Sequence, residues 1–317
     1  LAVVIRTDEK NAKVEDFANT PSGHQALLIR LTQAGVARVC LEATGAYHLD
    51  LALALDAGGL ALMVVNPKAA KRFAEALMTR TKSDAVDAAM LAEFAQRMPF
   101  EAWQRPDRAA LELRAYARRL NALTEARTQA KNQLHALQQS TTTPALILEA
   151  VQLAIDETDA RIERLRAAAL ALIDAEATLK DAFALLTSVK GIGAASAVQI
   201  LGELRVLPPD LRAKQWVAMA GLDPRHATSG TSVNQKPRLS KAGNRYLRGS
   251  LYMPALSASR HDEHIKGYYR HLIEDRGLKK IQAVCAVMRK LLHAIHGMLK
   301  TGKPFDGQRF YVFPQAV

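Results

Sequence analysis

Residues 37–67, ARVCLEATGAYHLDLALALDAGGLALMVVNP, decide the fold of the first third of the chain. An apolar run at residues 37–41 ends at Glu42, a helical stretch follows at 47–55, and a second apolar run occupies 62–65. Strand and helix signals that alternate in this way indicate an α/β layer with a parallel or mixed sheet.

The same alternation is present upstream of this stretch. Leu1–Ile5 is strand-like, and a helix with an apolar face is expected from Ser22 onward. The sequence begins at Leu1, without a Met and inside a strand-like run, so we expect a further N-terminal segment to precede it.

Three acidic residues of this layer have the chemistry of a metal site. Glu42 ends a strand, and open α/β sheets place their sites at the carboxyl ends of strands. Asp84 and Asp87 are three residues apart in the first turn of a helix expected through residues 88–97, so they project from one face. Acids at a helix N-terminus also stabilise the helix, so capping remains an alternative to a Mg²⁺ site.

Residues 106–180 have a different pattern, that of two long helices separated by a break at residues 140–144. This heptad spacing predicts an antiparallel hairpin, which is either an internal helix pair or an arm that also pairs with another protomer. Arg127 and Thr158 interrupt the apolar seam and are expected to set its register. The seam positions, at steps of three and four, are Leu113, Tyr116, Leu120, Leu123, Arg127, Ala130, Leu134 and Leu137, then Val151, Ile155, Thr158, Ile162, Leu165, Ala169 and Leu172.

Residues 221–254 carry a basic run, and no Asp or Glu occurs between Asp223 and Asp262. Such a run repels itself unless it is solvated or faces an anion, so a surface loop and a nucleic-acid interface are both consistent with it. Ser229-Gly230-Thr231-Ser232 precedes most of the run and is expected to be a loop that holds a hydroxyl against a phosphate. The basic candidates for binding nucleic acid are Arg225, Lys236, Arg238, Lys241, Arg245 and Arg248.

Lys190-Gly191-Ile192-Gly193 leads into a helix expected over residues 194–204. It resembles a helix-hairpin-helix element, in which backbone N–H groups at a helix N-terminus face a phosphate. Lys190, Gly191 and Gly193 are therefore further candidates for binding nucleic acid.

Composition limits the partners. The chain has 317 residues and a formal net charge of +12, which favours a polyanion such as nucleic acid. No apolar run reaches the roughly 18 residues of a spanning helix, so no membrane partner is expected. Cys40 and Cys285 are both expected to be small buried hydrophobes, which favours a reducing, cytoplasmic environment without a disulfide framework.

Taken together, eight short motifs resemble the DEDD transposases of bacterial insertion sequences, specifically the insertion-sequence one-ten family of bridge-RNA-guided serine recombinases. They follow one another in the order expected for that family, over nearly the whole chain. They are Phe17–Thr20, Leu41–Gly45, Thr81–Ala88, Gly191–Gly193, Ala220–Leu222, Ser229–Val233, Leu239–Gly243 and Leu251–Pro254.

The resemblance implies three domains. Residues 1–105 are expected to form a RuvC-like, RNase H-fold metal-binding domain, and residues 106–180 a coiled-coil arm. Residues 181–317 are expected to form a mainly helical transposase domain that carries the serine loop and the basic surface.

The resemblance also implies the site. In the family an Asp, a Glu and two Asp bind Mg²⁺, and a serine attacks DNA. Glu42, Asp84 and Asp87 match the last three acids, and Ser229 matches the nucleophile. The first Asp is expected on a strand before Leu1 and has no counterpart within residues 1–317.

The partners implied by the resemblance are target and donor DNA, a structured noncoding guide RNA that pairs with both, and further copies of the chain in a dimer or tetramer joined through the arm. The expected function is Mg²⁺-dependent recombination that moves an insertion sequence, in the bacterial cytoplasm and at the nucleoid. Two alternatives stay open. One is a hydrolytic RuvC-like Holliday-junction or structure-specific nuclease, and the other is a non-enzymatic nucleic-acid scaffold.

Overall fold

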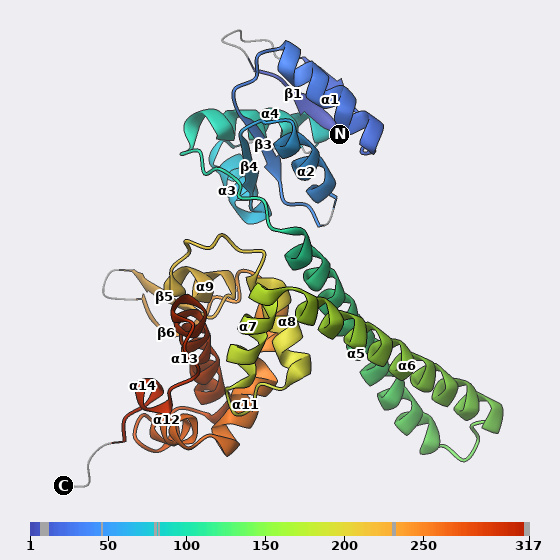
Figure 1. Cartoon of the computed structure of the whole chain (residues 1–317), viewed down its shortest axis with the longest axis vertical. Coiled ribbons are helices and arrows are strands. Elements are labelled where there is room, and N and C mark those ends of the chain that lie inside the picture. The colour runs from blue at the N-terminus through green and yellow to red at the C-terminus, as the bar shows by residue number, and fades with distance from the viewer. Residues whose placement is uncertain (7–12, 46, 79–80, 82, 230–232, 314–317) are drawn as a thin grey trace. The chain divides into compact units, whose positions relative to one another are not determined.

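The computed structural model divides the chain into two compact units, residues 1–105 and 106–317, coloured from blue to red along the chain in Figure 1. The arm expected as a domain of its own belongs to the second unit. For residues 226–229 and 233–236 only the backbone is described. The described residues are 1–6, 13–45, 47–78, 81, 83–229 and 233–313.

The first unit is an α/β layer, as the alternating pattern predicts. β3 (Val39–Glu42) and β4 (Leu62–Val65) are parallel, with Glu42 opposite Val65, and α2 (Leu49–Ala57) crosses between them. β1 (Ala2–Val4) pairs antiparallel with β2 (Val14–Asp16). Within the described part of the unit, no ladder of hydrogen bonds joins the two pairs, so they remain two small sheets.

Local sequence sets the ends of the other helices in this unit. Thr20, Asn66 and Ser83 each accept a backbone N–H at the start of a helix, which satisfies one of the free donors there. These helices are α1 (Pro21–Gln33), α3 (Pro67–Ala76) and α4 (Asp84–Arg97). The buried core consists chiefly of Leu27, Leu31, Leu41, Leu51, Leu55 and Leu62, with Met63, Val65, Met90 and Phe94 beside it.

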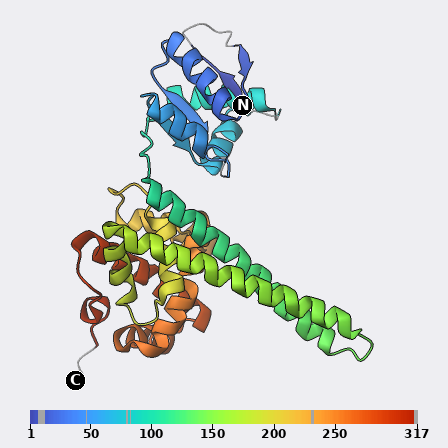
Figure 2. The ribbon, with the colours of Figure 1, turned by 45° about the vertical axis from the view of Figure 1, so that its right-hand side comes forward.

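The second unit begins with a helical hairpin. α5 (Arg108–Gln138) and α6 (Ala145–Ala175) run side by side in both views of Figures 1 and 2 and pack along their length. Leu113, Leu120 and Ile162 of the predicted seam are buried. The hairpin therefore buries its own apolar seam, and its base is continuous with the core of the second unit.

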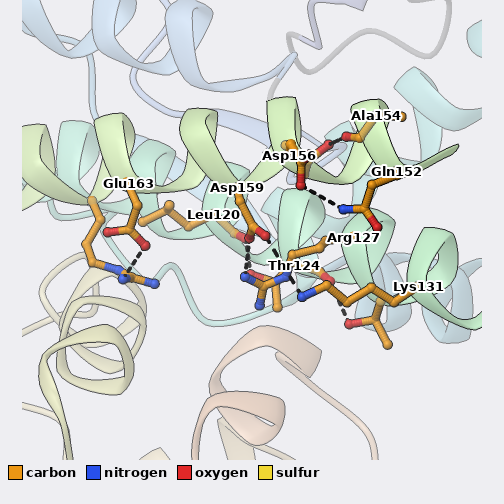
Figure 3. A network of polar contacts seen from close by, with 12 residues as sticks. Leu120, Thr124, Arg127, Lys131, Gln152, Ala154, Asp156, Asp159 and Glu163 are labelled. Carbon is orange, nitrogen blue, oxygen red and sulfur yellow. Dashed lines mark hydrogen bonds and ion pairs between the residues drawn. The ribbon is translucent and has the colours of Figure 1, made fainter. Parts of the chain in front are cut away.

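Arg127, the charged seam residue, joins the two helices of this hairpin. Its Nη1 lies 2.6 Å from Asp159 Oδ1, and Lys131 Nζ lies 3.9 Å from Oδ2 of the same carboxylate, as Figure 3 shows. Thr158 instead donates to the carbonyl of Ala154 in its own helix. Arg127 can therefore fix the register of the pair, whereas Thr158 makes no cross-helix hydrogen bond among the described contacts.

The rest of the second unit is mainly helical. Its centre is built by α8 (Ala194–Leu204) and α13 (Lys280–Thr301), most of whose large apolar residues are buried. α5 crosses α8 closely at Gly202, where a Cβ would lie 2.8 Å from Ala117 Cβ. The other helices are α7 (Ala177–Thr187), α9 (Ala213–Met219), α10 (Arg245–Ser250), α11 (Tyr252–His261), α12 (Glu263–Glu274) and α14 (Gly307–Phe310).

Part of the stretch expected to be a loop is instead a β-hairpin. β5 (Pro224–Ser229) pairs antiparallel with β6 (Val233–Leu239), and the register shifts between Arg225 and Ala227. Its strands lack apolar alternation, so sequence periodicity could not reveal them. Among the helices that the structure describes, none combines the length and apolarity needed to cross a bilayer.

Candidate catalytic residues and nucleic-acid interface

The three candidate acids lie at the ends of two elements of the first unit that pack together. Glu42 ends β3 and is half-buried, and its Oε1 accepts a hydrogen bond from Thr44 Oγ1 at 3.3 Å. Asp84 and Asp87 occupy the first turn of α4, where Asp84 is exposed and Asp87 half-buried. Ser83 Oγ accepts from Val86 N at 3.3 Å, so the serine caps the helix and neither carboxylate is needed for that bond.

These carboxylates supply the oxygen ligands that Mg²⁺ prefers, but they do not assemble into a site here. Glu42, Asp84 and Asp87 are all described, and no group of three or more His, Cys, Asp or Glu in the described ranges is close enough to hold a metal ion. The expected convergence of the three is therefore absent from this arrangement, and we derive no reaction step through a metal.

A cavity of about 850 Å³ lies between β1 and β3. Its walls include the residues of both strands, Glu42 among them, with leucines of α1 and α2 and the Ala88–Gln96 face of α4. Each strand pairs on one side only within the described residues, and a free strand edge presents unpaired N–H and C=O groups. The cavity therefore lies between two strand edges, each with free backbone groups.

Ser229, the candidate nucleophile, is the last residue of β5 and stands opposite Val233 at the tip of the hairpin. Its side chain and that of Lys236 lie outside what the structure describes, as do residues 230–232. Nearer the base, Arg225 and Arg238 are directly opposite each other and exposed. Like charges at opposite positions destabilise a strand pair, so a bound anion would relieve this one.

The segment after the hairpin is fixed to the end of α9. Ser240 Oγ donates to Asp223 Oδ1 at 2.5 Å, and Lys241, whose φ is +49°, donates its N–H to Gly221 O at 3.1 Å. A Cβ on Gly221 would lie 2.8 Å from Lys241 C, and one on Gly243 would overlap the carbonyl of Met219. Glycine is required at both positions because the backbones approach this closely.

The arginines of α10 have different partners. Arg245 is exposed at the first turn, whereas Arg248 Nη1 donates to Ala220 O at 2.9 Å and closes the end of α9. Arg248 therefore stabilises the end of α9 with one of its N–H groups. Its other N–H groups could still bind a phosphate.

The glycine turn between α7 and α8 is also held in place. Gly191 has a φ of +110°, and a Cβ there would lie 2.6 Å from Ala258 N in α11. Gly193 is the N-cap of α8, and Lys190 beside the turn is exposed. The turn is thus built by close packing on α11, with its lysine free to meet a ligand.

Comparisons with known proteins cover both units. One transposase family model matches residues 1–142, and the model of the transposase IS116/IS110/IS902 family matches residues 183–270. A pilin gene-inverting protein of Moraxella lacunata is 30% identical over 271 residues, which are 84% of this chain and 81% of the relative. The chain belongs to the IS110 family of transposases.

A second relative of this transposase, a pilin gene-inverting protein of Moraxella bovis, is 28% identical over 299 residues, 92% of this chain and 89% of the relative. The family predicted from the eight motifs is therefore confirmed, and with it the transposase and DNA-recombination class. The mixture of an α/β unit with a mainly helical one agrees with that assignment.

Sequence reasoning missed one polar cluster of this transposase. Glu203 is only 2% exposed inside the apolar helix α8, yet both of its oxygens have partners. An acid in a segment as apolar as residues 194–204 was the available signal, since a buried carboxylate needs partners. Those partners, Arg118 and Asn244, are 85 and 41 residues away in the chain, so no local pattern identified them.

Proposed function

We propose that this transposase cuts and rejoins DNA through a covalent bond between Ser229 and a DNA phosphate. The observation that carries the proposal is the position of Ser229 at the tip of a hairpin whose base presents Arg225 and Arg238 side by side. The sequence contains no acid between Asp223 and Asp262, so neither strand of the hairpin carries a negative charge. Family membership supports the same reaction class.

The proposed reaction is a phosphoryl transfer in which one phosphorus–oxygen bond forms while another breaks. The Ser229 oxygen forms a bond to phosphorus as the bond from phosphorus to the leaving sugar oxygen breaks. The serine gives up its proton to a base, and the leaving oxygen takes up a proton. A serine alcohol is a weak nucleophile at its ordinary pKa and must be activated. Because the phosphodiester link is conserved, attack by a new sugar hydroxyl can reverse the step without nucleotide hydrolysis.

Dependence on Mg²⁺ is the second part of the proposal. Glu42, Asp84 and Asp87 are the residues that would hold the ion, which when bound polarises a phosphate oxygen. Their present arrangement does not form a ligand shell, so the proposal requires the three carboxylates to come together when DNA binds. The proposal includes a RuvC-like fold for the α/β unit that carries these acids.

The partners follow from the same assignment. Target and donor DNA are the substrates, and the relatives that invert pilin genes favour inversion as one outcome. A structured guide RNA would read both DNAs by base pairing, while the basic protein surface holds backbone and shape. Leu146 and Leu153, which are 75% and 60% exposed on α6, support a dimer or tetramer joined through a coiled-coil arm.

The test is trapping of the adduct on a denaturing gel, with Mg²⁺, both DNAs and the guide RNA. Ser229→Ala should bind these partners as the wild type does and form no adduct. Ser240→Ala is the matched control, because Ser240 Oγ already bonds Asp223 and sits in the same basic segment. An adduct that persists in Ser229→Ala contradicts the proposal. Metal-dependent cleavage without an adduct would instead identify a hydrolytic nuclease, and binding without cleavage a scaffold.

A further inference from the structure

The chain that follows β3 is held close to Glu42 by its own backbone. The Ala43 N–H donates to Val65 O at 2.9 Å and continues the pairing of β3 with β4. The Thr44 N–H donates to Glu42 O at 2.8 Å, and the Tyr47 N–H donates to Thr44 O at 3.2 Å. Thr44 Oγ1 also bonds the Glu42 carboxylate at 3.3 Å. These contacts tie Tyr47 to the end of the strand that carries Glu42.

A residue of the Phe17–Thr20 motif holds the other side of Tyr47. Asn19 Nδ2 donates to Tyr47 O at 3.1 Å, and Asn19 Oδ1 lies 2.6 Å from His24 Nε2. Because the amide nitrogen is the donor to Tyr47, Oδ1 is the acceptor and His24 Nε2 carries the hydrogen. His24 is 5% exposed within α1, and a buried polar ring needs such a partner. The motif therefore has a structural role, which is to hold the backbone at Tyr47.

The Tyr47 side chain is open to solvent although its backbone is fixed. It is 76% exposed, more than any other aromatic side chain in the described ranges. A Cβ on Gly45 would lie 3.6 Å from Tyr47 Cδ2, so one edge of the ring lies beside the Gly45 backbone. An aromatic ring in water lacks the stabilisation that its burial would supply. A ring that is already fixed can gain this stabilisation from a ligand with little further loss of conformational entropy.

The surroundings of Tyr47 favour an uncharged contact. Glu42, Thr44 and Tyr47 all line the cavity between β1 and β3. A carboxylate such as that of Glu42 repels a phosphate at short range unless a cation lies between them. The face of a nucleobase is uncharged and stacks on an aromatic ring, and this contact tolerates any base. Of the two parts of a nucleotide, the base is therefore the one that suits Tyr47.

Family membership supplies the class of ligand. The chain is an IS110-family transposase with a formal net charge of +12, so its substrate is nucleic acid. Bases inside an intact duplex are stacked on one another, so only an unpaired base presents its face to a protein. Recombination makes such bases available, because strands that are exchanged must leave one duplex before they pair in another.

We propose that Tyr47 stacks on an unpaired nucleobase beside Glu42, with Asn19 and His24 as the positioning residues that hold its backbone. The inference goes beyond the proposed function, since it requires neither the serine adduct nor a bound metal. A base that lies on the Tyr47 ring cannot return to its duplex while it stays stacked. The site thus keeps a strand open next to the candidate catalytic acids.

The experiment measures the affinity of the whole chain for four labelled probes by fluorescence anisotropy. They are a DNA single strand, an abasic DNA strand of the same length, a fully paired duplex and an RNA single strand. Tyr47→Leu should weaken binding of the DNA single strand by about tenfold, because stacking of a base on the ring is lost. It should change affinity for the abasic strand and the duplex by less than about twofold, since neither presents an unpaired base. Tyr47→Phe keeps the ring and should match the wild type on every probe.

Phe313→Leu is the matched control, because it removes another exposed aromatic ring, which is 42% exposed in the second unit. Tyr47→Leu that matches Phe313→Leu on all probes would overturn the site. An equal loss on the natural and abasic strands would also overturn it, because the contact would then be with the backbone. So would Tyr47→Phe that binds as weakly as Tyr47→Leu. A loss on the DNA strand, the RNA strand or both supports the site and identifies the source of the base.

Asn19→Ala tests the positioning role. It removes the bond to Tyr47 O and keeps the ring, so it should weaken binding of the natural strand several-fold and leave binding of the abasic strand unchanged. Combined with Tyr47→Leu it should add no further loss, because both changes act through one ring. Unchanged binding of the natural strand, an equal loss on both strands, or a loss that adds to that of Tyr47→Leu would overturn this role.

The site and the proposed function fail in different ways. Tyr47-dependent binding of the natural strand in a protein that never forms a serine adduct would contradict the proposed function and leave this site intact. An adduct in the wild type, with Tyr47→Leu binding all four probes normally, would do the reverse. Both Tyr47 variants should melt at the wild-type temperature by circular dichroism, since the side chain is exposed and the backbone bonds are kept.

Discussion

Two groups of carboxylates show how differently this chain uses the same chemistry. At the base of the helical hairpin, Glu203 is buried and bonded by Arg118 and Asn244. In the α/β unit, Asp84 is exposed, Asp87 is half-buried, and neither forms a ligand group with Glu42. A carboxylate with every oxygen engaged stabilises the fold, whereas one left open is available to a ligand. Burial and hydrogen bonding of the carboxylate therefore distinguish a structural acid such as Glu203 from candidate catalytic acids such as Asp84 and Asp87.

The largest expected effect tests the structural side of this comparison. Glu203→Ala leaves Arg118 half-buried without its partner and removes a bond that holds Asn244, so it should destabilise the chain by about 3–5 kcal/mol. Urea denaturation gives this free energy of unfolding. Asp84→Asn is the contrasting variant and should leave stability nearly unchanged. Equal effects of the two substitutions would show that burial does not distinguish these acids.

A second stability effect comes from the turn that anchors the basic segment. Gly243 has a φ of +131° and lies against the Met219 carbonyl, so Gly243→Ala should cost about 1–3 kcal/mol or more. Gly249→Ala is the control, because it sits in α10 with open space around its Cβ position and should be neutral or gain about 0.5–1 kcal/mol. Thermal melting compares the two, and a neutral Gly243→Ala would mean that the turn tolerates rearrangement.

Parts of this structure that depend on local sequence were predictable. The β4 strand and the α8 helix begin and end where their apolar runs do, and the break at residues 140–144 separates two helices. The absence of pairing between β1 and β3 in the described residues was not predictable, because strand pairing is non-local. The sequence of a strand is the same whether one or both of its edges are paired. The β5–β6 hairpin was not predicted, because its strands are polar and lack the apolar alternation that indicates a strand.

The candidate site divides in the same way. Helix geometry correctly placed Asp84 and Asp87 in one first turn, and the sequence motifs identified the family. The arrangement of these acids relative to Glu42 depends on packing between elements, which spacing does not encode. Arg248 illustrates the same limit, because its bond to the Ala220 carbonyl joins segments 28 residues apart.

A moderate effect is expected on the β-hairpin. Arg225→Gln and Arg238→Gln should each weaken nucleic-acid binding several-fold and lower the salt slope by about one, because each removes a phosphate contact. Hairpin stability should stay the same or rise by a few tenths of a kcal/mol, since opposed like charges are relieved. Lys266→Gln, exposed on α12, provides a charge-matched control. Loss of stability without loss of affinity would assign the pair a structural role.

The last prediction concerns oligomeric assembly, where the smallest effect on folding is expected. Leu153→Glu and Leu146→Glu place charges on exposed parts of α6, so they should reduce the mass measured by light scattering while the fold is retained. Leu120 is unsuitable for this test because it is 6% exposed in its own hairpin core. Gln152→Glu is the matched polar change in the same helix. An unchanged mass in the folded leucine variants would argue against assembly through this exposed face of α6.

The most direct measurement of the central claim is mass spectrometry of the protein–DNA adduct after nuclease and protease digestion. A nucleotide should be found attached to the peptide that contains Ser229, with fragment ions that place the phosphate on that residue. Ser229→Ala should yield no modified peptide under the same conditions. A nucleotide mapped to Ser232 or Ser240, or an adduct retained by Ser229→Ala, would contradict the assignment of the nucleophile.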